Sequence, residues 1–349
     1  MKISEMLKRE NFYEINRKTL SSFYADGTET TKLYIYPKLN AIVSQKPSSN
    51  VKGYLLCEYS VRSNIFKKII VLMYVNLCML SRGILSDRAI EVRGKINNDI
   101  LIYPCNKKYR IFDFKKQTVD VIIKDGFCAS DLRHEIEFRG KDSLPSFVPR
   151  LLSFSEKGYK EIIIDGRPLA RIGDGFQKYR DMAYNQLCAY MASQADVIDS
   201  KTYVRKLKRK TEELATDKVK DKECLQKIIS TFEKIKIEDE IPISFSHGDL
   251  QAGNIWVENK TEKVFIIDWE SWGVRSCWYD KAVLYDNLRP GGLDAYFKNK
   301  IDITERVVVL FEDLIFQLTE LNNLPGNFGE EQFEKYLLQL NKYIERMGT

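Results

Sequence analysis

Two short polar loops, each following a strand-like segment, constrain this chain more than any other feature. The first reads SHGDLQAGN over residues 246–254, and the second reads IIDWE over residues 266–270. They carry Asp249, Asn254 and Asp268, and the segment between them reads as a β-hairpin. Two carboxylates and one amide form a set of hard oxygen ligands of the kind that Mg²⁺ prefers. With a phosphate donor present, one Asp can receive a hydroxyl proton while the Asn and the other Asp hold the metal.

The two motifs, in this order, resemble those of the aminoglycoside phosphotransferase and choline kinase superfamily. Here H-G-D-x-x-x-x-N stands where protein kinases have H-R-D-x-x-x-x-N, and I-D-W-E stands where they have D-F-G. Either motif alone would be a weak signal, but the spaced pair is specific. The resemblance implies an α+β, bilobal protein-kinase-like fold with a five-stranded small lobe and a helical large lobe.

The resemblance also implies a role for each matching position. Asp249 would be the catalytic base, or would at least orient the acceptor hydroxyl. Asn254 and Asp268 would bind a Mg²⁺ ion that bridges the nucleotide phosphates. His247 and Asp280 would support the loop, the latter because Tyr-Asp often follows I-D-W-E in this family. For His247, one of only two histidines, this structural role is favoured over a nucleophile or a metal ligand.

The match is looser in the expected small lobe. Lys124 ends the strand-like VIIK, as the V-A-I-K lysine does in kinases, and would hold the α- and β-phosphates. Glu135 from the next helix would pair with this lysine, although Glu137 is an alternative partner. A plain strand-end lysine is the alternative interpretation of Lys124. The backbone at the lobe hinge would contact the adenine, namely at Ile162, Ile163 and Ile164.

Two regions depart from the family pattern. The predicted hairpin over residues 103–110 contains no glycine, so a Gly-rich phosphate loop of the protein-kinase type is absent. Phosphate binding there would depend more on Lys107, Lys108 or backbone amides. Residues 1–98 have no counterpart in the family, and we expect them to form an additional α/β segment of unknown role.

The hydrophobic pattern supports a β-rich small lobe over residues 99–166 and a helical large lobe over residues 167–349. We predict small-lobe strands at 100–104, 109–114, 118–124, 151–154 and 159–165, and a helix that begins near Ser130. In the large lobe we predict helices over 176–192, 203–214, 222–236, 303–321 and 331–346, with strands at 243–245, 255–258 and 264–268. In the N-terminal segment we predict strands at 32–37 and 51–58 and a helix at 65–80.

The longest apolar run, residues 69–80, is twelve residues long and is interrupted by Asn76. Crossing a bilayer takes about 20 apolar residues. We therefore expect this run to lie in a buried core helix, and we expect no transmembrane segment. The polar N-terminus argues against a secretory signal, and seven scattered cysteines without a C-x-x-C pair favour reduced thiols. Together these features predict a cytoplasmic protein.

Charge is distributed unevenly along the chain. Residues 1–98 carry 16 Lys and Arg against 8 Asp and Glu, whereas residues 270–349 carry 9 against 13. The basic N-terminal third could meet nucleic acid or a lipid surface, but a solvated basic surface is the simpler interpretation. No helix-turn-helix, zinc-finger or RNA-recognition pattern accompanies the charge, so we expect no nucleic acid partner.

The residues and the resemblance together imply an enzyme, an ATP- and Mg²⁺-dependent phosphotransferase. It would move the γ-phosphate to a hydroxyl of a small molecule of the aminoglycoside, choline or sugar type. The acidic C-terminal region suits a cationic acceptor, and the sequence leaves both ATP and GTP open as the donor. It fixes neither the acceptor nor the oligomeric state. The alternatives are a nucleotide-binding kinase-like scaffold and an atypical protein kinase, although H-R-D, D-F-G and A-P-E are missing.

Overall fold

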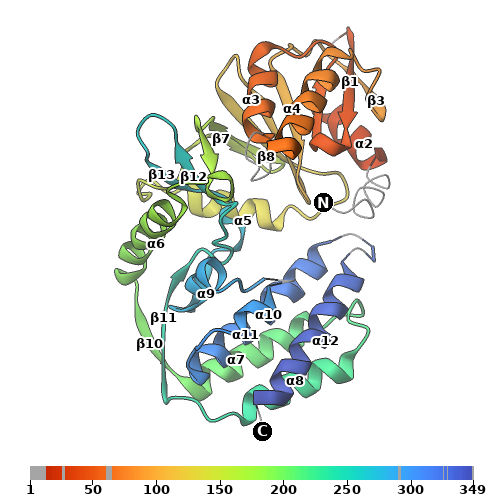
Figure 1. Cartoon of the computed structure of the whole chain (residues 1–349). Helices are drawn as coiled ribbons and strands as arrows, with labels where there is room; N and C mark the ends of the chain where they lie inside the picture. Colours follow the sequence, from red (N-terminus) through yellow and green to blue (C-terminus); the bar gives the residue numbers. More distant parts are fainter. Residues whose placement is uncertain are drawn as a thin grey trace. The chain divides into compact units, whose positions relative to one another are not determined.

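The computed structural model describes residues 13–25, 28–59, 65–289, 292–324, 326–327 and 329–347. This part of the chain has a mixed α/β architecture (Figure 1). None of its helices combines the length and the hydropathy needed to cross a bilayer. The first twelve residues, which argue against a secretory signal, lie outside the described residues. The chain divides into two compact units: unit 1 comprises residues 1–176 and 256–263, and unit 2 comprises residues 177–255 and 264–349.

Unit 1 is built on an eight-stranded antiparallel sheet of order β3-β1-β2-β4-β5-β6-β8-β7. Its strands are β1 (Thr30–Tyr36), β2 (Ala41–Ser44), β3 (Arg88–Arg93), β4 (Ile100–Pro104), β5 (Lys108–Asp113), β6 (Thr118–Ile123), β7 (Leu151–Ser155) and β8 (Gly158–Ile162). The last five are the five strands predicted for the small lobe. The first three come from the N-terminal segment, and β2 pairs directly with β4. The division predicted at residue 98 is therefore crossed by a continuous sheet.

The described helices of unit 1 are α2 (Tyr13–Phe23), α3 (Ser49–Tyr59), α4 (Ile65–Leu80) and α5 (Ser130–Arg139). These helices cover both faces of the sheet. Neighbouring residues of a strand point to opposite faces, so they pack into different cores. Leu101 of β4 packs into a core that contains residues of α3, α4 and α5. Its neighbours Ile100 and Ile102 pack into a second core that contains Leu20 of α2.

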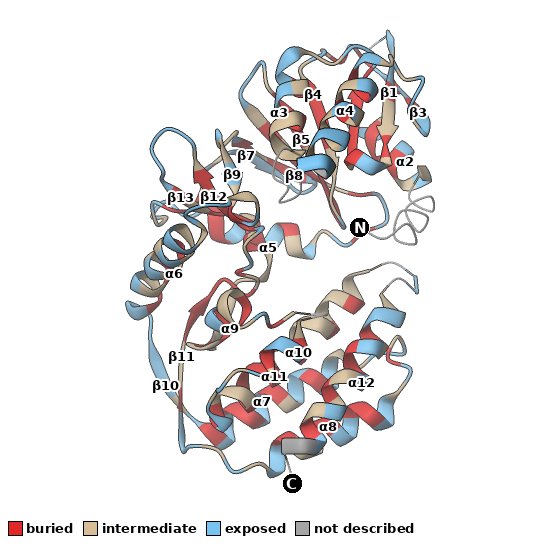
Figure 2. Cartoon of the chain, viewed as in Figure 1, coloured by how far each residue is buried: buried red, intermediate tan, exposed pale blue. Residues whose placement is uncertain are grey.

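Two predictions for the N-terminal segment are wrong. Residues 51–58 form a helix rather than a strand, because Val51 and Leu55 are buried one helical turn apart. The helix at 65–80 is confirmed, but it is not a buried core helix. Val75 is buried, whereas much of the opposite face of α4 is exposed (Figure 2).

Unit 2 is mainly helical and is packed around a central helix. Its helices are α6 (Phe176–Ala192), α7 (Ser200–Leu214), α8 (Lys222–Lys234), α9 (Tyr279–Tyr285), α10 (Leu293–Tyr296), α11 (Ile303–Asn323) and α12 (Glu330–Met347). All residues from 307 to 311 are buried, so α11 is covered on every side and lies at the centre of the core. The five helices predicted for the large lobe are confirmed to within a few residues at each end.

The remaining strands position the polar loops. β10 (Asp196–Asp199), β11 (Glu240–Ser246) and β14 (Gly273–Ser276) form a three-stranded antiparallel sheet in unit 2. β11 leads directly into the first loop. In unit 1, β12 (Ile255–Glu258) pairs with β9 (Gly166–Pro168). β13 (Val264–Ile266) leads into the second loop.

Candidate active site

The loop that follows β11 is fixed by one buried carboxylate. Asp280, at the start of α9, is fully buried and accepts hydrogen bonds from the backbone N–H groups of His247 (2.9 Å) and Gly248 (3.0 Å). Gly248 has φ of +83°, and a Cβ there would lie 2.1 Å from the carbonyl oxygen of Ser271. Only glycine fits this position, which explains the glycine of the H-G-D motif.

His247 joins the two loops through both ring nitrogens. Its Nδ1 accepts a hydrogen bond from the backbone N–H of Asp249 (3.2 Å), so the proton is assigned to Nε2, which donates to the carbonyl oxygen of Ile267 (3.0 Å). The ring is fully buried and lies 4.4 Å from the ring centroid of Trp269. With both nitrogens in use, the neutral imidazole has the structural contacts that the sequence analysis favours for it.

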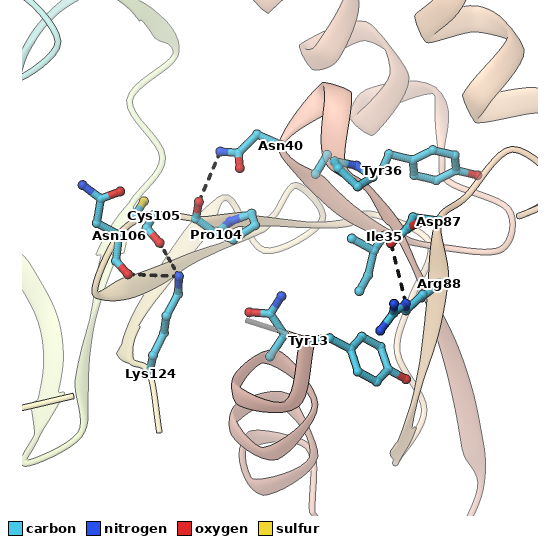
Figure 3. Close-up of a pocket in the computed structure, with 13 residues that line it drawn as sticks. Tyr13, Ile35, Tyr36, Asn40, Asp87, Arg88, Pro104, Cys105, Asn106 and Lys124 are labelled. Carbon is cyan, nitrogen blue, oxygen red and sulfur yellow. Dashed lines mark hydrogen bonds and ion pairs between the residues drawn. The ribbon is translucent and has the colours of Figure 1, made fainter. Parts of the chain in front are cut away.

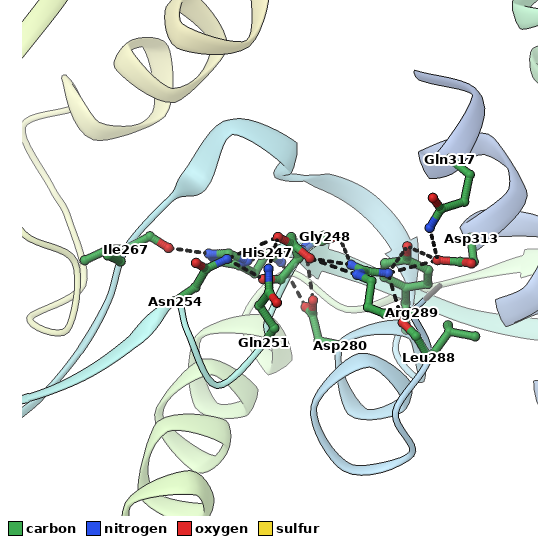
Figure 4. Close-up of polar contacts among 12 residues, drawn as sticks. His247, Gly248, Gln251, Asn254, Ile267, Asp280, Leu288, Arg289, Asp313 and Gln317 are labelled. Atoms are coloured by element: carbon green, nitrogen blue, oxygen red, sulfur yellow. Dashed lines mark hydrogen bonds and ion pairs between the residues drawn. The ribbon is translucent and has the colours of Figure 1, made fainter. Parts of the chain in front are cut away.

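The Asp249 carboxylate accepts four side-chain hydrogen bonds. They come from Gln251, Asn254 and Arg289, which Figure 4 labels. Asp249 Oδ1 accepts from Arg289 Nε (2.9 Å) and from a terminal guanidinium nitrogen of the same residue (2.7 Å). Its Oδ2 accepts from Gln251 Nε2 (2.9 Å) and Asn254 Nδ2 (3.2 Å). Asn254 Nδ2 also donates to the Asp249 carbonyl (2.9 Å), so the amide nitrogen faces Asp249 and the amide oxygen points away from it.

Arg289 is a residue of this site that the sequence analysis does not identify. Besides Asp249, it contacts the carbonyl oxygen of Gly248 (3.0 Å) and Oδ1 of Asp313 on α11 (2.9 Å). Burial acts to lower the pKa of the guanidinium, but Tyr279 and the two carboxylates outweigh it and raise that pKa above its usual value. Arg289 therefore stays charged between two carboxylates. It lies outside both motifs, so no local pattern singles it out.

The second loop carries two carboxylates that lie close to each other. The backbone N–H of Ile267 donates to the carbonyl oxygen of Asn254 (2.9 Å), which ties the two loops together. The next residue, Asp268, has φ of 70° and ψ of 56°, a left-handed conformation that is uncommon outside glycine. Carboxylate oxygens of Asp268 and Glu270 lie within 4.8 Å of each other. Carboxylate oxygens of this kind, and the amide oxygen of Asn254 on the first loop, are ligand types that fit Mg²⁺.

In unit 1, Glu135 of α5 is the centre of a buried ionic network. Its carboxylate accepts from Lys108 Nζ (3.4 Å), from a guanidinium nitrogen of Arg139 (3.0 Å) and from the hydroxyl of Tyr159 (3.0 Å). Arg139 also contacts Glu161 (2.5 Å). Glu135 is fully buried, whereas Glu137, the alternative in the sequence analysis, is exposed.

Lys124 has different contacts from those that the sequence analysis expects. Its Nζ donates to the carbonyl oxygens of Cys105 and Asn106, the latter at 3.1 Å, and lies 5.1 Å from the centroid of the Tyr109 ring. Figure 3 shows this lysine directed at the turn between β4 and β5, in a pocket that Tyr13 of α2 also lines. Lys108, at the start of β5, makes the ion pair with Glu135 that was predicted for Lys124.

The signal for Lys108 is present in the strand pattern. β5 pairs with β6 so that Lys108 lies opposite Ile123 and Phe112 lies opposite Val119. Lys108 and Phe112 share one face of the strand, because their separation is an even number of residues. Phe112 packs in the core that contains α5. The predicted strand at 109–114 began one residue too late to include Lys108.

The predicted hinge follows β8. The Ile162 side chain is 59% exposed, and the backbone N–H of Ile163 donates to the carbonyl oxygen of Gln117 (3.0 Å). Ile163 and Ile164 line a pocket within unit 1, together with Tyr54 of α3 and Phe114. The rings of Tyr54 and Phe114 lie 5.3 Å apart. α3 thus contributes an aromatic wall to the pocket at the hinge.

Comparison with known proteins gives one family match. Residues 159–285, a little over a third of the chain, match the family described as choline/ethanolamine kinase. No curated protein matches this chain significantly. The matched segment contains both polar loops and Asp280, but neither Lys108 nor Arg289.

Several solved structures resemble the chain weakly. A choline/ethanolamine kinase family protein from Mesorhizobium loti has 13% identity and a TM-score of 0.46, covering 70% of this chain and 88% of that one. A Plasmodium vivax ethanolamine kinase has 12% identity and a TM-score of 0.43, covering 87% of this chain and 98% of that one. An aminoglycoside-3'-phosphotransferase of type VIII has 16% identity and a TM-score of 0.42, covering 63% of this chain and 94% of that one. All three TM-scores lie below 0.5. The family match itself confirms, over residues 159–285, the resemblance to the aminoglycoside phosphotransferase and choline kinase superfamily that the two motifs predict.

Proposed function

We propose that this chain is a phosphotransferase that moves the γ-phosphate of ATP, with Mg²⁺, to a hydroxyl group of a small molecule. The observation that carries the proposal is the arrangement of the first loop. Arg289 and Asn254 hold the Asp249 carboxylate, and Asp280 fixes the backbone of the loop. This loop lies within the segment that matches the family. Phosphate transfer needs little covalent help from the protein, so positioned charges of this kind supply most of the rate.

The contacts of Asp249 favour an orienting role over that of a strong base. A carboxylate offers about four lone-pair sites, and here four N–H groups occupy them. The ion pair with Arg289 holds the carboxylate in one orientation. Gln251 is exposed and is the donor that an incoming hydroxyl could most easily replace at Oδ2. The hydroxyl would then be held towards the γ-phosphate, and its proton would pass to Asp249 late in the transfer, as the new O–P bond forms and the bond to the nucleoside diphosphate breaks.

Asp268, Glu270 and the amide oxygen of Asn254 are the groups that would hold Mg²⁺. Bound there, the ion would supply positive charge that neutralises the phosphate oxygens during transfer. The left-handed backbone at Asp268 turns the chain so that its carboxylate and that of Glu270 come within 4.8 Å of each other. This closeness supports a cation site, because a divalent cation offsets the repulsion between two neighbouring carboxylates.

For the nucleotide, we propose Lys108 as the phosphate-binding lysine and the hinge pocket as the base site. Lys108 is held by Glu135 in the way that the predicted kinase lysine would be, and its side chain is only 8% exposed. The pocket lined by Ile163, Ile164 and Phe114 offers an apolar surface for a planar base. Lys124, by contrast, supports the turn between β4 and β5.

This assignment separates two lysine variants. Lys108→Met is expected to lower kcat/KM for the nucleotide by about a hundredfold, because it removes the charge from the phosphates. Lys124→Met, the matched control, is expected to stay within about fivefold of the wild type, since its ammonium group contacts backbone carbonyls. Initial rates at varied nucleotide concentration measure both, with thermal melts to confirm folding. An equal or larger loss in Lys124→Met would restore the original prediction for that residue.

A pocket between α11 and α12 is the proposed acceptor site. Gln317, Glu320 and Tyr336 line it, and both Gln317 Nε2 (3.5 Å) and the Tyr336 hydroxyl (2.8 Å) donate to Asp313. Asp313 in turn contacts Arg289, the partner of Asp249. The family description supports a small amino alcohol as the acceptor, and Glu320 adds an acidic group suited to its cationic end. Aminoglycosides and sugars are the other candidates.

An unbiased acceptor screen tests the function. The full-length protein is incubated with γ-labelled ATP, Mg²⁺ and a pool of small hydroxyl compounds, and the products are examined for the mass gain of one phosphoryl group. GTP is run beside ATP. One acceptor should gain the label with the wild type and not with Asp249→Asn. Mg²⁺-dependent nucleotide binding without transfer to any acceptor would instead favour a nucleotide-binding scaffold.

A further inference from the structure

Helix α4 exposes an unusually large apolar surface. Of the seventeen exposed large apolar side chains in the part of the chain that the structure describes, nine lie within residues 65–85. Phe66, Ile70, Met73, Leu77 and Leu80 recur at the spacing of one helical face, and Phe66 is 74% exposed. Isolated exposed apolar residues are ordinary on a protein surface, but a continuous stripe of this length marks an interaction site.

The opposite face of α4 fixes the orientation of this stripe. Val75, Cys78 and Met79 are buried in the core that α4 shares with α3 and the sheet of unit 1. Ser81, just after the helix, hydrogen-bonds the carbonyl oxygen of Cys78 (2.8 Å). The stripe is therefore the outward face of a helix that is firmly packed on its inner side (Figure 2).

The charged residues of the segment that carries the stripe have one sign. From residue 59 to residue 86 the sequence contains no Asp or Glu but four basic residues. Of these, Lys68 lies on α4 and Arg82 is exposed just after its end. Lys38 is also exposed, and its Nζ lies 5.7 Å from the centroid of the Tyr74 ring on α4. The apolar stripe thus has a basic rim, within the segment that holds the excess positive charge of the chain.

We propose that the exposed face of α4, defined by Phe66, Ile70, Met73, Leu77 and Leu80, docks on an anionic lipid surface. Apolar side chains would enter the boundary between headgroups and acyl chains, while the basic rim would meet the anionic headgroups. A helix of 16 residues is about 24 Å long, which is too short to cross the hydrocarbon core but suits a helix lying in its surface. This proposal does not depend on the proposed phosphotransfer.

The charge pattern favours lipid over a second copy of the chain. In a symmetric dimer through α4, each basic rim would face its own equivalent, since a twofold interface brings the same patch of both subunits together. Arg82 and Lys38 of one copy would then approach like charges across the interface, which disfavours pairing. An anionic surface carries the complementary charge for both residues.

Vesicle sedimentation of the full-length protein tests the proposal. The vesicles are phosphatidylcholine alone, or equal parts of phosphatidylcholine and phosphatidylserine. The partition coefficient of the wild type into the mixed vesicles is expected to exceed that into phosphatidylcholine by at least about tenfold. The double variant Met73→Asp/Leu77→Asp is expected to lower it by about a hundredfold. Lys38→Glu/Arg82→Glu is expected to abolish the preference for phosphatidylserine.

Leu338→Asp is the matched control, since Leu338 of α12 is 57% exposed, close to the 59% of Met73 and the 55% of Leu77. It is expected to leave partitioning within about twofold of the wild type, and thermal melts check that each variant folds. Absence of vesicle binding would overturn the proposal, as would binding that Met73→Asp/Leu77→Asp leaves intact. A wild-type dimer in light scattering that the same double variant makes monomeric, without vesicle binding, would assign the face to a second copy.

Discussion

Asp249→Asn is expected to lower kcat for phosphate transfer by about a thousandfold. The substitution preserves the size of the side chain but removes its charge. The ion pair with Arg289 is lost, and an amide NH₂ group would face either that arginine or the donors Gln251 and Asn254. The acceptor hydroxyl would then meet a repelled or misoriented group. Initial rates with the acceptor identified by the screen measure the effect.

Two controls make this result specific. Nucleotide affinity is expected to change by less than about threefold in Asp249→Asn, because Asp249 is not among the residues proposed to hold the nucleotide or Mg²⁺. Gln251→Ala is expected to lower kcat by less than about tenfold, since the proposed step has this side chain leave when the hydroxyl binds. A wild-type rate in Asp249→Asn, with the fold intact, would remove the basis of the proposed function.

Arg139→Met is expected to lower the free energy of unfolding by about 3–5 kcal/mol. The Arg139 side chain is fully buried and contacts Glu135 (3.0 Å), Glu161 (2.5 Å) and the carbonyl oxygen of Pro149 (2.8 Å). Removing the guanidinium leaves two buried carboxylates with less compensation, which is far more costly than losing an exposed ion pair. Denaturant titration followed by circular dichroism measures the change.

Arg209→Met provides the matched control on a different helix. Arg209 of α7 pairs with Glu213 at 3.4 Å, and both pairs join an arginine and a glutamate four residues apart. The Arg209 side chain is 81% exposed, however, so its removal is expected to cost under about 1 kcal/mol. Equal losses in the two variants would show that burial of the network contributes nothing to stability.

The sequence was informative where the chemistry lies on contiguous residues. The loop over residues 246–254 and the strand before it are local features, and so is the tight approach that requires Gly248. Arg289 could not be predicted because its partnership with Asp249 joins residues 40 apart in the chain, and no turn, cap or period records such a contact. The ion pair between Lys108 and Glu135 was missed for a related reason. It depends on which face of its strand Lys108 occupies, and a shift of one residue reverses that face.

The N-terminal segment shows a second limit of periodicity. A short apolar run reads alike as a buried strand or as part of a helix, which is why residues 51–58 were predicted as a strand. For α4 the secondary structure was predictable, but its burial was not. A helix that is apolar all round is normally buried. In the structure the two faces of α4 differ, because Val75 is buried on one side and Met73 is exposed to solvent on the other.

The pairing of β2 with β4 has a consequence for any attempt to shorten this protein. A chain cut before residue 99 would lose β2 and would leave the backbone N–H and C=O groups of β4 along an open sheet edge, which is a template for aggregation. The same cut would remove Tyr54 from the hinge pocket. The N-terminal segment is therefore a structural partner of the kinase-like strands, and the smallest part of the chain expected to fold soundly includes it.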